Sequence, residues 1–436
     1  MKFYSTNRQS PSVGLREAVM TGLAPDGGLY MPERIPVIPA AFFNNISAMS
    51  VRDIAFVVAD LMLGGDIESA EIRQIVNDTF TFDIPLVKVE DNIWALELFH
   101  GPTYAFKDVG ARFLARIISH YSSRSASGRV KVLVATSGDS GGAVAAGFRG
   151  VHDVEVYILY PSGQLSRMQR EQLDVDNGSV HAIEVLGTFD DCQRLVKQAF
   201  ADADLRRVFE LTSANSINIC RLLPQMFYFF HAYGALSGRC RDTRERVVVS
   251  IPSGNLGNLT AGLLAWRMGL PVKRFVVANN INDVTVNYLL TGKFLPRRAV
   301  RSVACAMDVG NPSNISRILD MFDGDYGPIS RLVKGHSYTD ADILAAMSRT
   351  YSADSYLVDP HGASALAALL DDIREGEQGI FLATAHPAKF ANTVYDATGV
   401  ELKSPRVAAP PHRPSHPRIS ASYEALKKIL MSGTNS

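Results

Sequence analysis

One lysine, Lys107, stands where amine chemistry is possible. It follows the turn Gly101-Pro102-Thr103 and lies between Phe106 and Asp108, just before a segment of helical composition at residues 109–118. An amine at a loop-to-helix junction among apolar side chains loses water, which lowers its pKa and makes it a nucleophile able to form a Schiff base. The alternative that this segment leaves open is a surface lysine whose hydrocarbon chain lies along the protein.

A glycine–asparagine turn further along the chain has the features of a phosphate site. It comprises Ser253, Gly254, Asn255, Leu256, Gly257 and Asn258, between a predicted strand at 247–251 and a predicted helix at 259–268. Such a turn directs backbone N–H groups outward at the positive end of the helix dipole, and its glycines let the backbone approach a phosphate. It matches neither GxxxxGK[ST] nor GxGxxG, which disfavours a nucleoside triphosphate and a dinucleotide. An ordinary turn capped by asparagine remains the alternative.

A second glycine-rich turn, ATSGDSGGA, follows a predicted strand at residues 130–135. The hydroxyls of Ser137 and Ser140 and the neighbouring glycine amides offer donors at a helix N-terminus, which suits a carboxylate or a phosphate. Asp139 is unusual in an anion site unless it faces a cation such as a substrate ammonium group. A simple capped turn is the alternative.

Three further polar segments are weaker candidates. Asn218 and Arg221 lie in TSANSINICR, where Arg221 could bind a phosphate ester with two hydrogen bonds or could be a surface arginine. Thr384 ends a predicted strand at residues 379–383, and ligands of open parallel sheets bind at that edge. His386 and His361 are single histidines, which are more often structural than catalytic.

Composition and charge exclude several classes of protein. The chain has 44 basic and 44 acidic residues, so no net charge attracts nucleic acid or a membrane surface. Its four cysteines form no CxxC pair, which disfavours a zinc site or a disulfide framework and indicates a reducing compartment. There is neither a signal-like N-terminus nor an apolar run of membrane-spanning length. We therefore expect a cytoplasmic protein without a bound metal.

The elements that must position these residues follow an alternating pattern. Short apolar runs at residues 130–135, 154–160, 180–185, 247–251, 275–279 and 379–383 alternate with helical segments. This alternation is typical of an α/β fold whose parallel sheet is covered on both faces. We expect a small N-terminal domain at residues 1–90, a catalytic body of two subdomains at 91–400, and an extension at 401–436 with a last helix at 423–431.

The candidate groups together suit one cofactor. A phosphate turn, a Schiff-base lysine, a carboxylate site and a strand-end hydroxyl would hold a molecule that carries a phosphate, an aldehyde and a ring nitrogen. Pyridoxal 5′-phosphate has all three groups and is the electron sink for amino-acid carbanions.

The same segments resemble the threonine synthase family. The motifs LAPDGGLYMPE, GPTYAFKD, ATSGDSGGA, ANSINICR, PSGNLGN and TAHPAK occur in this order. The resemblance implies PLP fold type II, with parallel-rich open sheets covered by helices and a small N-terminal domain. It also implies conversion of O-phospho-L-homoserine and water to L-threonine and phosphate, by γ-elimination and β-addition of water.

Roles follow from this resemblance at matching positions. Lys107 matches the lysine that forms the internal aldimine and moves protons during the reaction. Thr384 matches the hydroxyl that faces the pyridine nitrogen. The cofactor phosphate would be held by Gly254, Asn255, Leu256, Gly257 and Asn258. The substrate would be held by Ser137, Asp139 and Ser140, with Asn218 and Arg221 as candidates for its phosphate group.

Alternatives remain because the chain departs from the family pattern. GDSG replaces the expected GDTG, and Tyr104 and Cys220 stand where other residues are expected. A lyase that releases 2-oxobutyrate from the same substrate is one alternative, and a non-catalytic sensor of phosphate ligands is another. The expected partner is a small-molecule substrate, with no nucleic acid or membrane, and the chain is expected to be a monomer or a homodimer.

Overall fold

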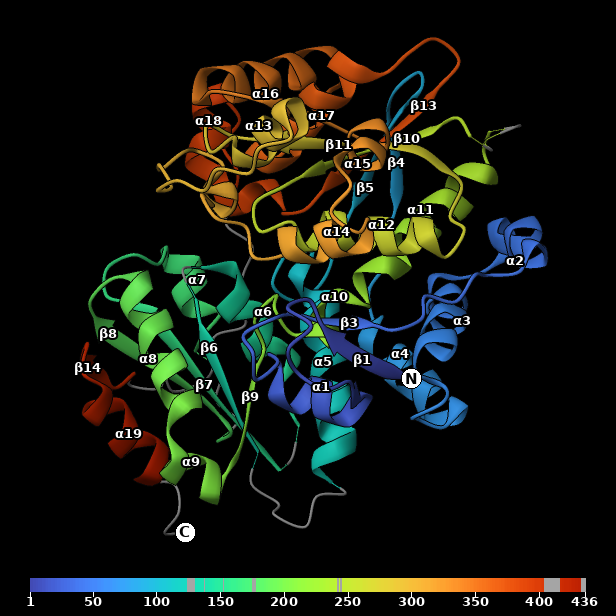
Figure 1. Cartoon of the computed structure of the whole chain (residues 1–436). Helices are drawn as coiled ribbons and strands as arrows, with labels where there is room; N and C mark the ends of the chain where they lie inside the picture. The colour runs from blue at the N-terminus through green and yellow to red at the C-terminus, as the bar shows by residue number, and fades with distance from the viewer. Residues whose placement is uncertain are drawn as a thin grey trace. The chain divides into compact units, whose positions relative to one another are not determined.

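The computed structural model describes residues 1–123, 130–136, 138–151, 153–174, 178–240, 243, 245–403 and 416–432 (Figure 1). Contacts divide the chain into two compact units. The first unit comprises Met1 and residues 31–106 and 222–405, and the second comprises residues 2–30, 107–221 and 406–436. Strand β3 (Tyr30–Pro32) crosses the boundary between them.

A six-stranded sheet forms the centre of the first unit, in the order β12-β11-β10-β13-β5-β4. All neighbouring strands are parallel except β4, which runs antiparallel to β5. The strands are β4 (Leu86–Glu90), β5 (Ile93–Glu97), β10 (Val247–Pro252), β11 (Val272–Asn279), β12 (Val333–Ser337) and β13 (Gln378–Ala383). The central strand β10 reads VVVSIP and is buried throughout, as expected for a strand covered on both faces.

Helices cover both faces of this sheet. Helix α17 packs on β10, β11 and β13, with α16 and α18 outside it, while α11 and α12 lie on the opposite face (Figure 1). The helices are α2 (Ala40–Asn45), α3 (Val51–Leu63), α4 (Ser69–Thr79), α11 (Gln225–Ser237), α12 (Gly257–Arg267), α13 (Val284–Thr291), α14 (Ile315–Met321), α15 (Tyr326–Leu332), α16 (Asp340–Asp354), α17 (Pro360–Asp372) and α18 (Ala391–Thr398). The described part of this unit also forms the short 3₁₀ helices η1 (Ile46–Ala48), η2 (Cys305–Met307) and η3 (Pro387–Phe390).

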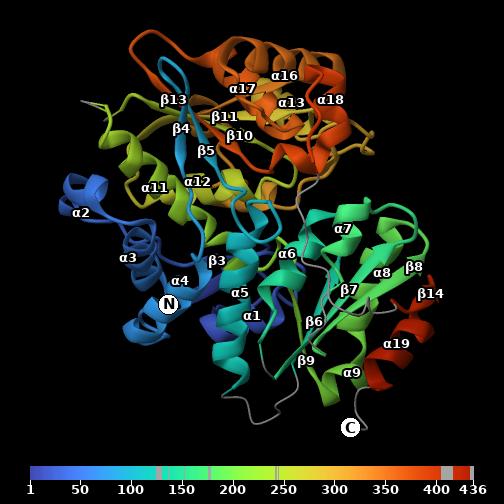
Figure 2. The same ribbon diagram turned by 180° about the vertical axis from the view of Figure 1, so that it is seen from behind.

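The second unit contains a five-stranded parallel sheet in the order β14-β8-β7-β6-β9. Its strands are β6 (Val130–Ala135), β7 (Val154–Pro161), β8 (Val180–Leu186), β9 (Glu210–Ser213) and β14 (Arg418–Ser420), and β1 (Lys2–Ser5) pairs antiparallel with β2 (Val13–Gly14). Its helices are α1 (Leu15–Thr21), α5 (Lys107–Ser122), α6 (Asp139–Gly147), α7 (Arg167–Glu171), α8 (Phe189–Ala201), α9 (Ala203–Val208), α10 (Ile219–Leu222) and α19 (Tyr423–Ser432). Helices α8 and α19 lie together on one side of the sheet, and α5 and α6 lie on the other (Figure 2).

The expected alternation of strands and helices is confirmed, including the strand at 130–135. Helix α7 begins at Arg167, because Ser166 and Gln169 form a capping box there. One detail differs, since the antiparallel edge strand β4 was not anticipated. The expected boundaries at residues 90 and 400 stay a prediction, and the two compact units divide the chain at other positions. Across the described residues, every helix is too short or too polar to span a bilayer.

Candidate functional site

Three neighbouring strands of the first unit end at the same edge of the sheet. Ser250 of β10 lies opposite Phe381 of β13. Ala383 of β13 lies opposite Glu97 of β5. Because the strands are parallel and in register, the segments that follow them emerge side by side. These segments are the glycine–asparagine turn, the strand-end threonine and the loop that leads to the candidate lysine.

The glycine–asparagine turn has the donors that an anion needs. Leu256, the residue before α12, adopts a left-handed conformation, with φ of 58°, and its side chain does not cap the helix. The amides of the first helical turn therefore point toward whatever the turn binds. Asn258 is buried, and its Nδ2 atom has no hydrogen-bond partner among the residues that the structure describes. A phosphate group seated here would satisfy these donors, so the turn fits the phosphate of the expected cofactor.

The back of this turn is held by residues that local sequence patterns did not reveal. A Cβ atom on Gly254 would lie 2.7 Å from the carbonyl oxygen of Ala306, so only glycine fits. The carbonyl oxygen of Asn255 accepts a hydrogen bond of 2.9 Å from Asn314 Nδ2. Asn314 and Asn255 are 59 residues apart, which is why no motif links them.

A buried arginine forms a hydrogen bond with Asn314. Arg317 donates a hydrogen bond of 2.7 Å to Asn314 Oδ1, and its side chain is fully buried. Burial lowers the pKa of Arg317 to about 9, because desolvation disfavours the charged form. Nothing in the sequence indicates the role of this arginine, except that it lies three residues, about one helical turn, after Asn314.

The loop that precedes Lys107 is fastened to the end of β13. The backbone N–H of Phe106 donates to the carbonyl oxygen of Thr384 at 2.9 Å, and Ala105 forms a bridge with Ala385. Thr384 itself is buried, with 6% of its surface exposed. Lys107 is half-buried and begins α5, so the expected loop-to-helix junction is present.

Tyr104 and His386 interact across the same loop. Tyr104 has a left-handed backbone, with φ of 58°, and its carbonyl oxygen accepts a hydrogen bond of 3.0 Å from the His386 backbone N–H. Their rings lie 5.9 Å apart. Burial lowers the pKa of His386, and its Nδ1 atom accepts from the Ala388 N–H at 3.1 Å. His386 is therefore neutral and caps η3. It has the structural role that a single histidine has more often than a catalytic one.

The second glycine-rich turn lies in the second unit, between β6 and α6. Thr136 Oγ1 accepts hydrogen bonds from the N–H groups of Gly138 and Gly141, at 3.1 and 2.9 Å, so these two amides already have a partner. Asp139 is buried, and its Oδ1 atom accepts from Gln169 Nε2 at 3.1 Å. Ser140 is half-buried, and Ser137 falls outside the described residues.

Asn218 and Arg221 are deeply buried in the second unit. Asn218 Nδ2 donates to the carbonyl oxygens of Val19 and Ser213, at 2.9 and 3.0 Å. Arg221 Nη1 donates to the Ala214 carbonyl at 2.5 Å. Burial lowers the pKa of Arg221 to about 10, while the charge of nearby Asp108 opposes this shift. These contacts hold the loop together, and a role in binding substrate stays a prediction.

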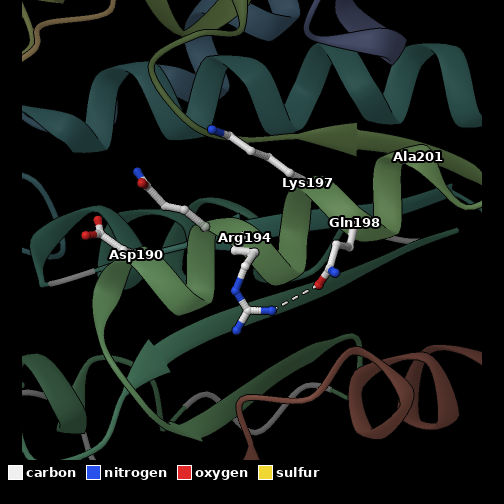
Figure 3. Close-up of a pocket in the computed structure, with 6 residues that line it drawn as sticks. Asp190, Arg194, Lys197, Gln198 and Ala201 are labelled. Atoms are coloured by element: carbon white, nitrogen blue, oxygen red, sulfur yellow. Dashed lines mark hydrogen bonds between the residues drawn. The ribbon is translucent and has the colours of Figure 1, made fainter.

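A separate hollow runs along the outer face of α8 (Figure 3). It is lined by Asp190, Gln193, Arg194, Lys197, Gln198 and Ala201. All six residues belong to one helix, and none is a predicted site residue. The hollow is the groove between side chains of a solvent-facing helix and has no arrangement of groups suited to chemistry.

Comparison with known proteins identifies the class. A family model for pyridoxal-phosphate-dependent enzymes matches residues 75–384. The structure aligns with that of the PLP-bound threonine synthase from Brucella melitensis over all of both chains, with a TM-score of 0.93 and 31% identity. The fold is therefore PLP fold type II, and the chain is a PLP-dependent enzyme, as expected.

Family models that match the two terminal regions of the chain, together with similar known proteins, identify the particular family. Models for the threonine synthase N terminus and C-terminal region match residues 2–80 and 362–427. The threonine synthase of Haemophilus influenzae is 41% identical over 93% of both chains. The crystal structure of threonine synthase from Escherichia coli covers all of both chains with a TM-score of 0.89 and 37% identity. The chain belongs to the threonine synthase family.

Proposed function

We propose that this enzyme converts O-phospho-L-homoserine and water to L-threonine and phosphate. Its membership of the threonine synthase family supports this reaction. The observation that carries the proposal is the shared edge of β10, β13 and β5, where three predicted segments emerge together. A sensor would not need a lysine on one of these segments.

Each segment would hold a different part of the cofactor. The turn from Gly254 to Asn258 would bind the phosphate through its amides, and the buried Nδ2 of Asn258 would add a donor. The hydroxyl of Thr384 would face the ring nitrogen, and Lys107 would bind the aldehyde. Pyridoxal 5′-phosphate, when bound, supplies an electron sink that makes protons next to the substrate amine acidic.

Lys107 would do the proton transfers. The Lys107 amine would remove the proton at Cα and then one at Cβ, and would deliver one proton to Cγ and one back to Cα. Departure of the phosphate from Cγ, protonation of Cγ and addition of water at Cβ would then give threonine. Thr384 would offer the ring nitrogen a hydroxyl in place of a carboxylate, which would leave that nitrogen less protonated and would limit the delocalisation of charge into the ring.

The substrate would contact the second glycine-rich turn. Ser137, Asp139 and Ser140 are the proposed contacts, with Asp139 already oriented by Gln169. Asn218 and Arg221 remain in the proposal as candidates for the substrate phosphate, although their described hydrogen bonds go to the protein backbone. We also propose a monomeric or homodimeric enzyme of the cytoplasm, which the balanced charge and the free cysteines favour.

The test is product analysis with the natural substrate. Purified enzyme is incubated with O-phospho-L-homoserine, and threonine, 2-oxobutyrate and phosphate are measured together. Equal amounts of threonine and phosphate support the proposal. Phosphate with 2-oxobutyrate and no threonine would establish the lyase instead, and absence of phosphate release would favour the sensor.

A further inference from the structure

A buried hydrogen bond joins helix α11 to the glycine–asparagine turn. The hydroxyl of Tyr228, near the start of α11, donates to Asn258 Oδ1 at 2.5 Å. Asn258 is the second residue of α12 and belongs to the turn that is proposed to hold the cofactor phosphate. Tyr228 lies 30 residues earlier in the chain and belongs to no motif that the sequence carries.

Close packing of the two helices brings the hydroxyl to the amide. Helix α11 packs against α12, and Gly262 lies about one turn after Asn258 on α12. A Cβ atom on Gly262 would lie 3.1 Å from the ring of Phe229, so a glycine permits this approach. Tyr228 precedes Phe229 and is fully buried. The position of the Tyr228 hydroxyl is therefore fixed by the core of the first unit.

The hydroxyl is a donor, and its proton goes to Asn258. A tyrosine hydroxyl has one proton to donate, and Tyr228 also lies 3.3 Å from Gln225 Oε1. The contact with Asn258 Oδ1 is the shorter of the two. Burial raises the pKa of Tyr228 well above its ordinary value of 10, so the hydroxyl stays protonated at neutral pH. This bond determines which way the Asn258 amide faces.

The amide nitrogen of Asn258 is left for a ligand. Its Nδ2 atom has no hydrogen-bond partner in the described part of the chain, and only 6% of Asn258 is exposed. A buried donor without a partner is destabilising, and a bound anion would remove this cost. A phosphate dianion offers only acceptor oxygens, so it needs Nδ2 rather than Oδ1 toward it. The amides at the start of α12 favour the same kind of ligand.

The backbone of the turn is held by other contacts. Asn314 Nδ2 donates to the carbonyl oxygen of Asn255 at 2.9 Å, and the Ser313 N–H donates to Asn255 Oδ1 at 2.5 Å. Neither bond involves Asn258. Loss of the Tyr228 hydroxyl should therefore release the Asn258 side chain while the turn keeps its backbone conformation.

We propose that Tyr228 is a positioning residue that holds the Asn258 amide with Nδ2 toward the cofactor phosphate, and that it thereby sets the preference for pyridoxal 5′-phosphate over pyridoxal. The inference rests on the proposed phosphate site in the turn from Gly254 to Asn258. Tyr228 itself would not touch the cofactor and would act only through Asn258. The expected sign of this role is a loss of affinity that depends on the phosphate group.

The experiment measures the Kd of the full-length enzyme for two probes, pyridoxal 5′-phosphate and pyridoxal, by equilibrium dialysis. Tyr228→Phe should raise the Kd for pyridoxal 5′-phosphate by about tenfold, because the phosphate loses an oriented donor. It should leave the Kd for pyridoxal unchanged. Tyr326→Phe removes a hydroxyl that donates to the Leu289 carbonyl in the same unit, and this control should change neither value. An equal loss for both probes in Y228F, or no loss for pyridoxal 5′-phosphate, would overturn the proposal.

Two variants of Asn258 test whether Tyr228 acts through it. Asn258→Ala should weaken pyridoxal 5′-phosphate binding at least as much as Y228F does, and the double variant should be no weaker than N258A. Asn258→Asp keeps an acceptor for Tyr228 but has no donor for the phosphate, so it should also lose the preference over pyridoxal. Urea unfolding of each variant checks the fold.

The outcomes separate this inference from the proposed phosphate site. Normal binding of pyridoxal 5′-phosphate by N258A and N258D would refute Asn258 as a phosphate ligand, and the inference would fall with it. Weak binding by N258A with additive losses in the double variant would overturn the role of Tyr228 alone. These binding readouts do not depend on catalytic activity.

Discussion

The backbone N–H of Phe106 donates a hydrogen bond of 2.9 Å to the carbonyl oxygen of Thr384. This bond joins the residue before the candidate lysine to the residue whose hydroxyl is proposed to face the cofactor ring. The loop before Lys107 and the end of β13 are distant in sequence, and this hydrogen bond holds them together. The loop that leads to Lys107 is therefore held by the end of this sheet.

Replacement of Lys107 by alanine should abolish threonine formation. The amine both binds the aldehyde and moves the protons, so we expect a fall in kcat of about 10³-fold or more. The visible absorbance of the bound cofactor, and its loss on borohydride treatment, provide a second readout. Lys197→Ala, on the exposed face of α8, is the matched control and should behave as the unaltered enzyme. A K107A variant with normal activity would refute the assignment of the lysine.

Gly254→Ala should damage the phosphate turn. The added methyl group would lie 2.7 Å from the carbonyl oxygen of Ala306 and 3.1 Å from Met307 Cα, and backbone atoms cannot move aside cheaply. We expect a loss of about 1–3 kcal/mol in the free energy of unfolding and weaker retention of the cofactor, measured by denaturant unfolding and equilibrium dialysis. Gly14→Ala is the control, because a Cβ atom there meets no atom within 4 Å. Unchanged stability and cofactor retention in G254A would contradict the described packing.

Arg221→Gln distinguishes a structural role from a substrate-binding role. The change removes the positive charge of Arg221 from the surroundings of the fully buried Asp108, so the free energy of unfolding should fall by about 3 kcal/mol. Arg194→Gln removes an exposed partner of Asp191 and should have no measurable effect on stability. Normal stability in R221Q together with a large rise in KM would instead support contact with the substrate phosphate.

The stability of the first unit should depend on Glu377 at low pH. Burial alone would raise the pKa of this carboxyl, but hydrogen bonds from Arg274 and Lys273 outweigh burial and lower the pKa to about 2. A lowered pKa in the folded state means that the stabilisation is complete above the ordinary pKa of 4.5 and is lost as the pH falls toward 2.

Urea unfolding at a series of pH values provides the measurement. Glu377→Gln should be less stable than the unaltered enzyme at pH 7, by at most about 3 kcal/mol, and the difference should shrink between pH 4.5 and 2. Glu375→Gln, at an exposed neighbouring position, is the control and should show no such dependence. A difference between E377Q and the unaltered enzyme that is constant with pH would show that the carboxylate charge contributes nothing.

Much of the fold and the class of chemistry could be predicted from sequence. Apolar β-branched runs such as 130–135 form strands because their side chains pack on both faces of a sheet, and this preference is local. The glycine–asparagine turn and the segment around Lys107 carry their chemistry in residue types and spacing, so they could be recognised without coordinates. The family resemblance rested on the same segments and was confirmed by the comparisons.

Other features depended on contacts between distant residues. Arg317 supports the phosphate turn through Asn314, and neither residue belongs to a motif. Arg221 could equally have been a surface or a substrate-binding side chain by its sequence, yet it lies buried near Asp108. Burial and pairing of this kind cannot be read from a linear pattern, because they follow from how the helices pack.

The sequence by itself determined which segments form strands and helices and which turns can bind an anion or present an amine. Only the tertiary structure determined which of these segments lie next to one another at the edge of a sheet. The parallel register of β10, β13 and β5 brings the phosphate turn, Thr384 and the Lys107 loop to one edge. Register and packing are long-range properties, since they depend on hydrogen bonds and burial that join residues hundreds of positions apart.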